Sequence, residues 1–367
     1  MTSMTSRRVT VLRQVADDVA PATPIMRPPT AFFVPAELVN DLFGPGGMKE
    51  LRNLLEIIVE PEFTRGGAVD FAQLPRLQEV EVIVSTWGMP RLDAALLARL
   101  PCLKAVFYAA GSVSGWATPQ MFARGVRVTT ASAANAVPVA EFSAAMIALC
   151  LKRAFHAARE TRRARGFWPV RQETAGPGGY RSTVGLVSLG LIGRLTLERL
   201  LGDELRVLVY DPTIKPDEAE ALGVELTDLP TLFADSDVVS LHAPWLPQTE
   251  GLITGKLLAS MKPNAAFINT ARGAIVREQE MIQVLQARPD LQAILDVTHP
   301  EPPAPESPLY DLPNVFLTPH IAGSVGRECG RMGRLIVEET RRYVCGQALL
   351  HEVKASTLSV TAHGTHG

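Results

Sequence analysis

The sequence predicts an α/β protein with two parallel sheets, and three observations lead to this prediction. The chain has 367 residues, which is more than one small core organises, since a domain averages about 150 residues. Short β-rich runs alternate with helical stretches over most of its length, as in sheets whose strands are joined by crossover helices. A Gly/Pro-rich stretch at residues 174–182 separates two such series. We therefore expect two domains.

The first series begins at Ala31. Short β-rich segments predict its four strands, at residues 31–34, 80–86, 104–108 and 126–130. Two helical pieces precede Leu55, and a further helix is expected over residues 91–100. Because helical segments separate successive strands, we expect one parallel sheet.

A long helix is predicted over residues 139–165, before the Gly/Pro-rich stretch. Its first half is apolar, and its second half carries six basic residues between Lys152 and Arg165. A solvated helix face is the commonest reason for such a charge run, so we do not interpret it as a binding site.

The second series is expected to form a complete doubly wound sheet. Its predicted strands lie at residues 183–188, 206–211, 237–242, 265–270, 291–297 and 315–318. Its predicted helices start at Leu191 or lie over residues 216–222, 255–261 and 276–287. A last amphipathic helix over residues 323–346 is expected to return to the first sheet. Residues 1–29 and 356–367 are polar, and we expect them to form flexible tails.

Composition and charge exclude several classes of protein. Apolar residues make up 47% of the chain and charged residues 20%, as in an ordinary globular protein. The 36 basic and 38 acidic residues leave a net charge of −2, so no broad basic field is available for nucleic acid or anionic lipid. The four cysteines form no CxxC pair, which predicts no metal site and favours a reducing cytoplasm. The longest apolar run, residues 142–151, falls far short of the roughly 20 residues of a membrane span.

The clearest motif lies where the first strand of the second series meets its helix. Gly190 and Gly193 follow the strand that ends at Ser188 and open the helix from Leu191. A glycine-rich turn at a helix N-terminus is where a dinucleotide pyrophosphate binds, although many such turns carry glycine for packing alone. Ser188 stands where the G-x-G-x-x-G pattern has its first glycine.

An acidic residue at the end of the next strand supports the dinucleotide interpretation. Asp211 lies eighteen residues beyond Gly193, where a carboxylate can accept hydrogen bonds from ribose hydroxyls. The same carboxylate repels a 2′-phosphate, so NAD is the expected cofactor. Lys215 is close in sequence and leaves NADP as the alternative.

Three further polar residues follow strands of the same series. Arg272 comes after the strand at residues 265–270, Glu301 lies in the proline-rich loop after the strand at residues 291–297, and His320 follows the last strand. The carboxyl ends of parallel strands meet at the crevice where ligands bind. Taken singly, each residue has a duller interpretation as a loop or surface residue, and it is their joint placement that favours a site.

Such a set suits the reduction of a 2-oxo acid. Hydride must reach the carbonyl carbon while a proton reaches its oxygen, and histidine is the natural acid near neutral pH. A neighbouring carboxylate raises the pKa of a histidine and orients its ring. The planar guanidinium of arginine matches a substrate carboxylate.

At this point the chain resembles the D-isomer-specific 2-hydroxyacid dehydrogenases, a family that includes D-glycerate, glyoxylate/hydroxypyruvate, phosphoglycerate and D-lactate dehydrogenases. The resemblance runs from about Val82 to Tyr343. The segments that carry it are KAVFYAAG, NAVPVAE, VGLVSLGLIGR, VYDP, HAPWLPQTEGLI, MKPNAAFINTARGAIV, DVTHPEPP and LTPHIAGS.

The resemblance implies a Rossmann-type doubly wound NAD domain inserted into a smaller flavodoxin-like α/β substrate domain. Residues 151–324 would bind NAD, and residues 1–150, completed by residues 325–355, would bind substrate. The implied activity is the NAD-dependent interconversion of a small anionic 2-oxo acid and its D-2-hydroxy acid. A cytoplasmic homodimer without nucleic-acid, membrane or metal partners is expected.

The resemblance also assigns roles to individual residues. His320 would be the acid/base, Glu301 its partner and Arg272 the ligand of the substrate carboxylate. Asp296 would lie near the nicotinamide carboxamide, and the backbone amides of residues 110–112 would hold the substrate carboxylate. The other residues expected around the cofactor are Ser188, Gly190, Leu191, Ile192, Gly193, Asp211, His242, Pro244, Thr249, Thr270, Ala271 and Gly323. Those expected around the substrate are Arg272, Trp87, Gly88, Ala110, Gly111, Ser112 and Asn135.

The chain departs from the family in its first half. Residues 1–80 match poorly, and the segment SVSGWA after Gly111 lacks the acidic residue that the family usually has there. Trp87 lies just after the predicted strand at residues 80–86, and Trp116 follows the loop after Gly111. Either could wall the substrate pocket, although core packing is the commoner fate of tryptophan.

Several alternatives stay open within and beyond this family. A phosphite or phosphonate-type dehydrogenase is disfavoured because no lysine lies near Gly111, and a formate dehydrogenase because Glu301 stands where that branch has glutamine. An L-specific lactate or malate type is disfavoured because the dinucleotide motif begins only near residue 183. An NAD-sensing interaction protein of the corepressor type would keep the same three polar residues, and turnover of a 2-oxo acid distinguishes it.

Overall fold

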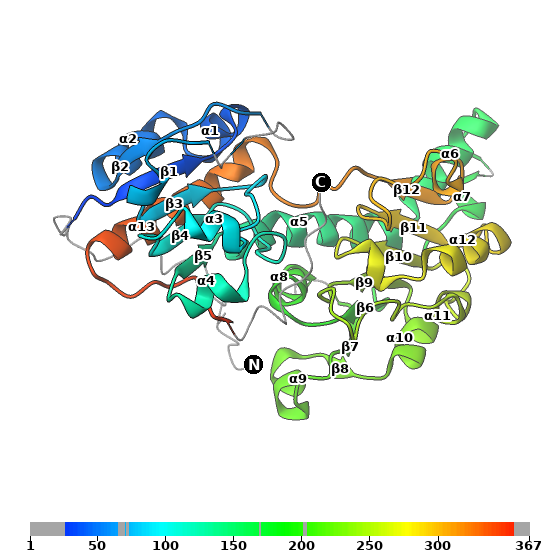
Figure 1. The fold of residues 1–367 in the computed structure, drawn as a ribbon. Helices are drawn as coiled ribbons and strands as arrows, with labels where there is room; N and C mark the ends of the chain where they lie inside the picture. The colour runs from blue at the N-terminus through cyan, green and yellow to red at the C-terminus, as the bar shows by residue number, and fades with distance from the viewer. Residues whose placement is uncertain (1–25, 65–69, 71–72, 169, 201–203, 356–367) are drawn as a thin grey trace.

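The computed structural model describes residues 26–64, 70, 73–168, 170–200 and 204–355, and it contains two mainly parallel sheets (Figure 1). The expected flexible tails fall almost entirely outside these ranges. The two sheets are joined by α5 and by the segment that leads into α13 (Figure 1). The predicted fold class is therefore confirmed.

The first sheet has six strands in the order β13-β5-β4-β3-β1-β2. All neighbours are parallel except β13, which runs antiparallel to β5. The strands are β1 (Pro29–Phe33), β2 (Glu56–Val59), β3 (Val82–Ser85), β4 (Ala105–Tyr108), β5 (Arg127–Thr130) and β13 (Glu352–Val353). Apolar clusters cover both faces of this sheet. The two edge strands were not predicted, because β13 has two residues and only one residue of β2 is buried.

The last long helix returns to the first sheet, as expected. It is α13 (Cys329–Val344), which packs against α1 (Ala36–Leu42), α2 (Gly44–Leu54) and β4. The prediction that it begins at residue 323 is wrong, because Gly326 has φ +53° and a 3₁₀ turn comes first. Gly333 lets α13 approach α1 closely, since a Cβ there would overlap the backbone of Leu42. The short helices of this unit are α3 (Ala94–Ala98) and α4 (Pro119–Ala123).

The second sheet has seven parallel strands in the order β12-β11-β10-β9-β6-β7-β8. The strands are β6 (Thr183–Val187), β7 (Arg206–Tyr210), β8 (Glu225–Leu226), β9 (Val238–Leu241), β10 (Ala266–Asn269), β11 (Gln292–Leu295) and β12 (Val315–Leu317). The helices that accompany them are α8 (Leu191–Leu200), α9 (Pro216–Leu222), α10 (Leu229–Asp235), α11 (Gly255–Ala259) and α12 (Glu278–Ala287). Apolar clusters cover both faces of this sheet too, as in a doubly wound fold.

The single helix predicted over residues 139–165 is two helices, α5 (Ser132–Leu151) and α6 (Ala154–Ala164). The break lies at Arg153, whose φ of +49° leaves the helical region. The Gly/Pro-rich stretch closes the end of α5, because the Gly178 N–H donates to the Leu151 carbonyl at 3.0 Å. The short helix α7 (Val170–Glu173) follows.

Helix α5 packs between the two sheets, against α8, β9, β10 and α13. By length and composition alone, α5 could cross a membrane. In this structure, however, 56% of its apolar stretch is buried inside the protein. Core helices of soluble proteins have the same two properties.

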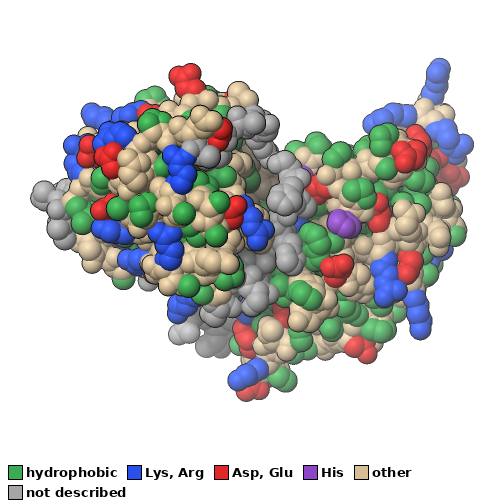
Figure 2. All heavy atoms as spheres, viewed as in Figure 1, with side chains coloured by type: hydrophobic (Ala, Val, Ile, Leu, Met, Phe, Trp, Pro, Cys, Tyr) green, Lys and Arg blue, Asp and Glu red, His purple; other side chains and the backbone are tan. Residues whose placement is uncertain are grey.

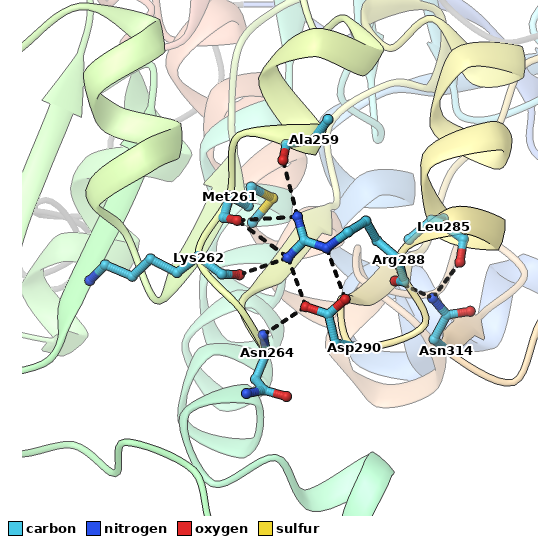
Figure 3. A network of polar contacts seen from close by, with 8 residues as sticks. All are labelled: Ala259, Met261, Lys262, Asn264, Leu285, Arg288, Asp290 and Asn314. Atoms are coloured by element: carbon cyan, nitrogen blue, oxygen red, sulfur yellow. Dashed lines mark hydrogen bonds and ion pairs between the residues drawn. The ribbon is translucent and has the colours of Figure 1, made fainter.

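A polar network fixes the edge of the second sheet opposite to the strand ends described below (Figure 3). The Arg288 guanidinium donates to both carboxylate oxygens of Asp290, at 2.9 and 2.7 Å, and to backbone carbonyls around Met261. The Asn314 amide donates to the Leu285 and Arg288 carbonyls. The network ties the end of α12 to the segment between α11 and β10 and to the residue that precedes β12.

Candidate active site

A cleft of about 1190 Å³ lies between the two sheets. Loops after β3 and β4 line it from the first sheet, and loops after β6, β9, β10, β11 and β12 line it from the second. These are the carboxyl ends of parallel strands, where ligands bind in open α/β sheets. The three residues expected to be catalytic, His320, Glu301 and Arg272, all line this cleft.

His320 and Glu301 form a hydrogen-bonded pair. The Nδ1 atom of His320 lies 2.6 Å from Oε1 of Glu301. Because a carboxylate oxygen can only accept, Nδ1 donates this bond, and Nε2 is the ring nitrogen that remains for a ligand. His320 has an uncommon left-handed backbone, with φ +54°, a conformation that clusters at functional sites.

Asp296 fixes the loop that carries His320. Its carboxylate accepts hydrogen bonds from the backbone N–H groups of Ile321 and Ala322, at 2.8 and 2.9 Å, and from the Thr318 hydroxyl at 2.7 Å. Its backbone carbonyl accepts from the His320 N–H. These contacts position the loop. Asp296 also lines the cleft, and its expected place beside the nicotinamide stays a prediction.

Arg272 brings a half-buried positive charge to the same cleft. It follows β10, and its turn is held by Asn269, whose amide donates to the Arg272 carbonyl at 3.1 Å. Gly273 is required next to it, because a Cβ there would overlap the backbone of Thr298. Burial lowers the pKa of Arg272 and the carboxylate of Glu301 acts against this shift, yet a guanidinium stays protonated in proteins. A half-buried cation in the wall of a cleft is suited to an anionic ligand.

Three of the residues expected around the substrate lie on the loop after β4 and at the start of α5. Gly111, Ser112 and Asn135 line the cleft. Asn135 also accepts the Ser324 N–H at 2.9 Å, which ties the start of α5 to the segment leading into α13. Ala110 is fully buried, does not line the cleft, and accepts the Ala131 N–H through its carbonyl.

The turn between β6 and α8 places a helix N-terminus in the cleft. Ser188 adopts the left-handed conformation of the glycine it replaces, with φ +76°. Open space surrounds the Cα of Gly190, whereas a Cβ at Gly193 would overlap the Ser188 carbonyl. The first glycine position thus tolerates a serine, and Gly193 is needed for close packing. Because unpaired N–H groups and the helix dipole favour anions, this turn fits a pyrophosphate.

Asp211 lies behind this turn and is held ionised. Burial raises the pKa of Asp211, but hydrogen bonds from Thr213, Leu189 and Ser188 outweigh it and the pKa is lowered. The Leu189 N–H lies 2.7 Å and the Ser188 hydroxyl 3.2 Å from the same carboxylate oxygen. The negative charge therefore stands beside the β6–α8 turn.

Most of the predicted cofactor residues are brought together, and three are not in the cleft wall. Those that line it are Ser188, Gly190, Leu191, Ile192, His242, Pro244, Thr270, Ala271, Asp296 and Gly323. Gly193 and Asp211 lie behind the wall, as described above. Thr249 also lies outside it, where its hydroxyl donates to the Pro244 carbonyl at 2.5 Å and accepts the Leu246 N–H at 2.8 Å. Its contacts shape the loop after β9.

His242 is a buried, neutral residue of the cleft wall. Burial lowers the pKa of His242 to about 4, and neither ring nitrogen has a hydrogen-bond partner among the described residues. Because buried polar groups are normally paired, these nitrogens are suited to a bound ligand or water.

The buried His242 predicts a loss of stability in acid. In the unfolded chain His242 binds a proton below about pH 6.5, whereas in the folded chain it does so only near pH 4. The contribution of neutral His242 to the free energy of unfolding is therefore fully present above pH 6.5 and is lost as the pH falls toward 4. By pH 5 the loss attributable to His242 is about 2 kcal/mol. We expect His242→Gln to remove this part of the acid sensitivity in urea unfolding of the ligand-free protein at pH 7 and pH 5. His351→Gln, outside the cleft, is the control, and equal acid sensitivity of wild type and His242→Gln would contradict the assignment.

Sequence reasoning missed several residues of the cleft wall. Those from the first sheet and α1 include Leu38, Asp41, Met89, Arg91 and Tyr108, and others lie on α5 and on the loops after β9 and β12. Met89 and Tyr108 follow or end predicted strands, and that position was the available signal. Trp87 and Gly88 were expected around the substrate, and both line the cleft. Trp116, which the sequence offered as a second possible wall residue, lines it as well.

Comparison with known proteins gives consistent matches. Residues 144–322 match the family described as D-isomer specific 2-hydroxyacid dehydrogenase, NAD binding domain. Glyoxylate reductase of Korarchaeum cryptofilum is 30% identical over 294 residues, which are 79% of this chain and 88% of that protein. D-3-phosphoglycerate dehydrogenase of Archaeoglobus fulgidus is 31% identical over 288 residues, which are 78% of this chain and 53% of that protein.

A solved structure of similar sequence and fold is that of D-lactate dehydrogenase from Aquifex aeolicus in complex with NAD and lactic acid. It is 26% identical, with a TM-score of 0.68, and the match covers 87% of this chain and 96% of that one. The chain spans about half the length of the phosphoglycerate dehydrogenases that it matches.

Proposed function

The chain belongs to the D-isomer-specific 2-hydroxyacid dehydrogenases, and on that premise we propose that it interconverts a small 2-oxo acid and its D-2-hydroxy acid with NAD. The observation that carries the proposal is the His320–Glu301 pair at 2.6 Å in the same cleft as Arg272 and the α8 N-terminus. A proton donor, a cation and an anion-binding helix end are the three elements that such a reduction requires.

The cleft fits NAD by several features. The α8 N-terminus at Gly190 would bind the pyrophosphate, and the Asp211 carboxylate would accept hydrogen bonds from the adenosine ribose. His242, whose ring nitrogens have no partner among the described residues, would contact the cofactor from the loop after β9. When bound as NADH, the cofactor supplies the hydride.

His320 and Arg272 would act on the substrate. Arg272 would bind the carboxylate through its guanidinium, with the backbone amides around Gly111 on the other side. The His320 Nε2 proton would pass to the ketone oxygen, and the Glu301 carboxylate would stabilise the imidazolium form and hold the ring through Nδ1. Reduction thus consumes one 2-oxo acid, one NADH and one proton, and the reverse reaction returns the proton to His320.

NADH oxidation at 340 nm tests this function on a panel of 2-oxo acids. We expect turnover of at least one acid, lost in a His320→Ala variant. Tight NADH binding with no turnover on the whole panel would overturn the proposal in favour of an NAD-sensing interaction protein.

The Asp211 carboxylate predicts a preference for NADH over NADPH. A charge beside the ribose repels a 2′-phosphate by several kcal/mol at an effective dielectric constant of about 20. We expect Asp211→Asn, which keeps the size and removes the charge, to raise the NADPH/NADH ratio of kcat/KM about tenfold or more. Asp217→Asn, an exposed residue of α9, is the control. An unchanged ratio would remove Asp211 from this role.

We also propose that the chain acts as a homodimer through an arm made of α6, residues 165–168 and α7. Helix α6 has no buried residue, and Phe167 and Trp168 are 76% and 63% exposed. The arm projects from the second sheet, and basic side chains gather over it (Figures 1 and 2). Exposed neighbouring aromatic residues favour a covering partner. We expect Trp168→Glu to shift the mass in multi-angle light scattering from dimer to monomer, and a wild-type monomer would contradict the dimer.

The remaining expectations concern domains and location. We propose residues 1–150 with residues 325–355 as the substrate domain and residues 151–324 as the NAD domain, which agrees with the membership of the two sheets. We propose a cytoplasmic protein without nucleic-acid or membrane partners. Four free cysteines support this, as does the mixture of acidic and basic side chains over the face in Figure 2.

A further inference from the structure

We propose that the 2-oxo acid carries a large apolar side chain, preferably an aromatic ring. This inference rests on the proposed function and concerns the wall of the cleft formed by the first sheet. The wall residues that argue for it are Trp87, Met89, Tyr108 and Trp116, hereafter the aromatic wall. Trp87 and Met89 are half-buried and supply the exposed apolar surface, whereas Tyr108 and Trp116 are almost completely buried in the cluster that supports them. Such a surface binds apolar groups by burial and ring contacts.

The aromatic wall adjoins the expected carboxylate site. Tyr108 ends β4, and Gly111 and Ser112 follow on the same loop and line the same cleft. Trp116 comes four residues later, and its ring centroid lies 5.0 Å from that of Tyr108. A substrate held by its carboxylate at Gly111 and Arg272 would therefore direct its side chain toward these rings.

The turn after β3 fixes Trp87 at the edge of the wall. The Met89 N–H donates to the Thr86 carbonyl at 3.2 Å, and Gly88 has φ +88°. A glycine at this position of a four-residue turn supplies the positive φ that the turn requires. Trp87 is half-buried and packs against the apolar clusters on both faces of the first sheet, so its ring is held rigidly.

The charges on this wall do not favour an anionic side chain. Among the described residues that line the cleft from the first sheet and α1, Arg91 and Asp41 are the charged ones, and their charges are opposite. Recognition of a phosphate or a second carboxylate normally uses several cationic or N–H donors together. An uncharged side chain of the substrate therefore suits this wall better than a phosphate or a carboxylate.

Steady-state NADH oxidation tests the inference with phenylpyruvate, 4-methyl-2-oxopentanoate, glyoxylate and 3-phosphohydroxypyruvate as substrates. We expect kcat/KM for phenylpyruvate to exceed that for glyoxylate about tenfold or more. Trp87→Ala should lower kcat/KM for phenylpyruvate about tenfold while the value for glyoxylate changes less than about threefold. Trp87→Phe should restore most of the phenylpyruvate activity. Tyr180→Ala, an exposed aromatic residue outside the cleft, is the matched control.

Several outcomes would overturn the inference and leave the proposed function intact. One is a preference for glyoxylate or 3-phosphohydroxypyruvate; another is an equal fall for all substrates in Trp87→Ala, which would indicate a structural role. A preference for the phosphorylated acid that is lost in Arg91→Ala would assign Arg91 to an anionic side chain instead. Absence of turnover with all four acids and with pyruvate would count against the proposed function itself.

Discussion

Replacing His320 with alanine is expected to lower kcat for reduction of a 2-oxo acid by about 10³-fold, because a positioned acid contributes about 10²–10⁴-fold to such a reaction. The Nδ1 atom of His320 is committed to Glu301 at 2.6 Å, which leaves Nε2 to donate to the ketone oxygen. NADH binding should change little, since the pyrophosphate site lies on α8 and the loop after β12 carries His320. Stopped-flow NADH oxidation and NADH fluorescence titration measure the two effects separately.

Two variants control this experiment. His351→Ala changes a histidine outside the cleft and should keep full activity. Glu301→Gln keeps the size of the partner but removes its charge, and it should lower kcat by a smaller factor than His320→Ala. If His320→Ala kept wild-type kcat, the proton donor would be another group and the assignment would fail.

Replacing Arg272 with lysine is expected to raise KM for the 2-oxo acid strongly and to lower kcat/KM by about 10²-fold or more. Lysine keeps the charge but loses the planar fork that binds a carboxylate through two parallel hydrogen bonds. Burial already lowers the pKa of Arg272, and a lysine ammonium in the same place would lose its proton more readily. The KM for NADH should stay close to wild type, because the guanidinium is assigned to the substrate.

The matched control is Arg277→Lys in the same segment of the chain. Arg277 lies on the surface, where it pairs with Glu280 at 3.2 Å, and its conservative replacement should leave both KM values unchanged. An unchanged KM for the 2-oxo acid in Arg272→Lys, with thermal unfolding confirming a folded protein, would remove Arg272 from carboxylate binding.

The sequence predicted the strand ends well because the signals there are local. Buried β-rich runs such as residues 266–269 are followed at once by the polar residues of the site, and the carboxyl ends of parallel strands meet by geometry alone. His320, Glu301 and Arg272 could therefore be placed in one cleft before any packing was known. Their roles as acid, partner and carboxylate ligand stay predictions.

Other features depend on contacts that no local pattern encodes. The helix breaks at Arg153, which adopts a left-handed backbone although it is not glycine. The loop that closes the end of α5 lies more than twenty residues further along the chain. The edge strands β2, β8 and β13 are too short or too exposed to produce a period-two pattern. The burial of the His242 ring and the contact of Tyr108 with Trp116 likewise follow from tertiary packing.

The central claim is that hydride passes to a 2-oxo acid in this cleft and that the product has the D configuration. Single-turnover reduction of phenylpyruvate, pyruvate and hydroxypyruvate with NADH that carries deuterium at both C4 positions of the nicotinamide tests it directly, with chiral chromatography and mass spectrometry of the product. We predict one deuterium at C2 of a D-2-hydroxy acid for each labelled hydride transferred, and product formation about 10³-fold slower with His320→Ala. An L-2-hydroxy acid, an unlabelled product or NADH that binds without being oxidised would contradict the account.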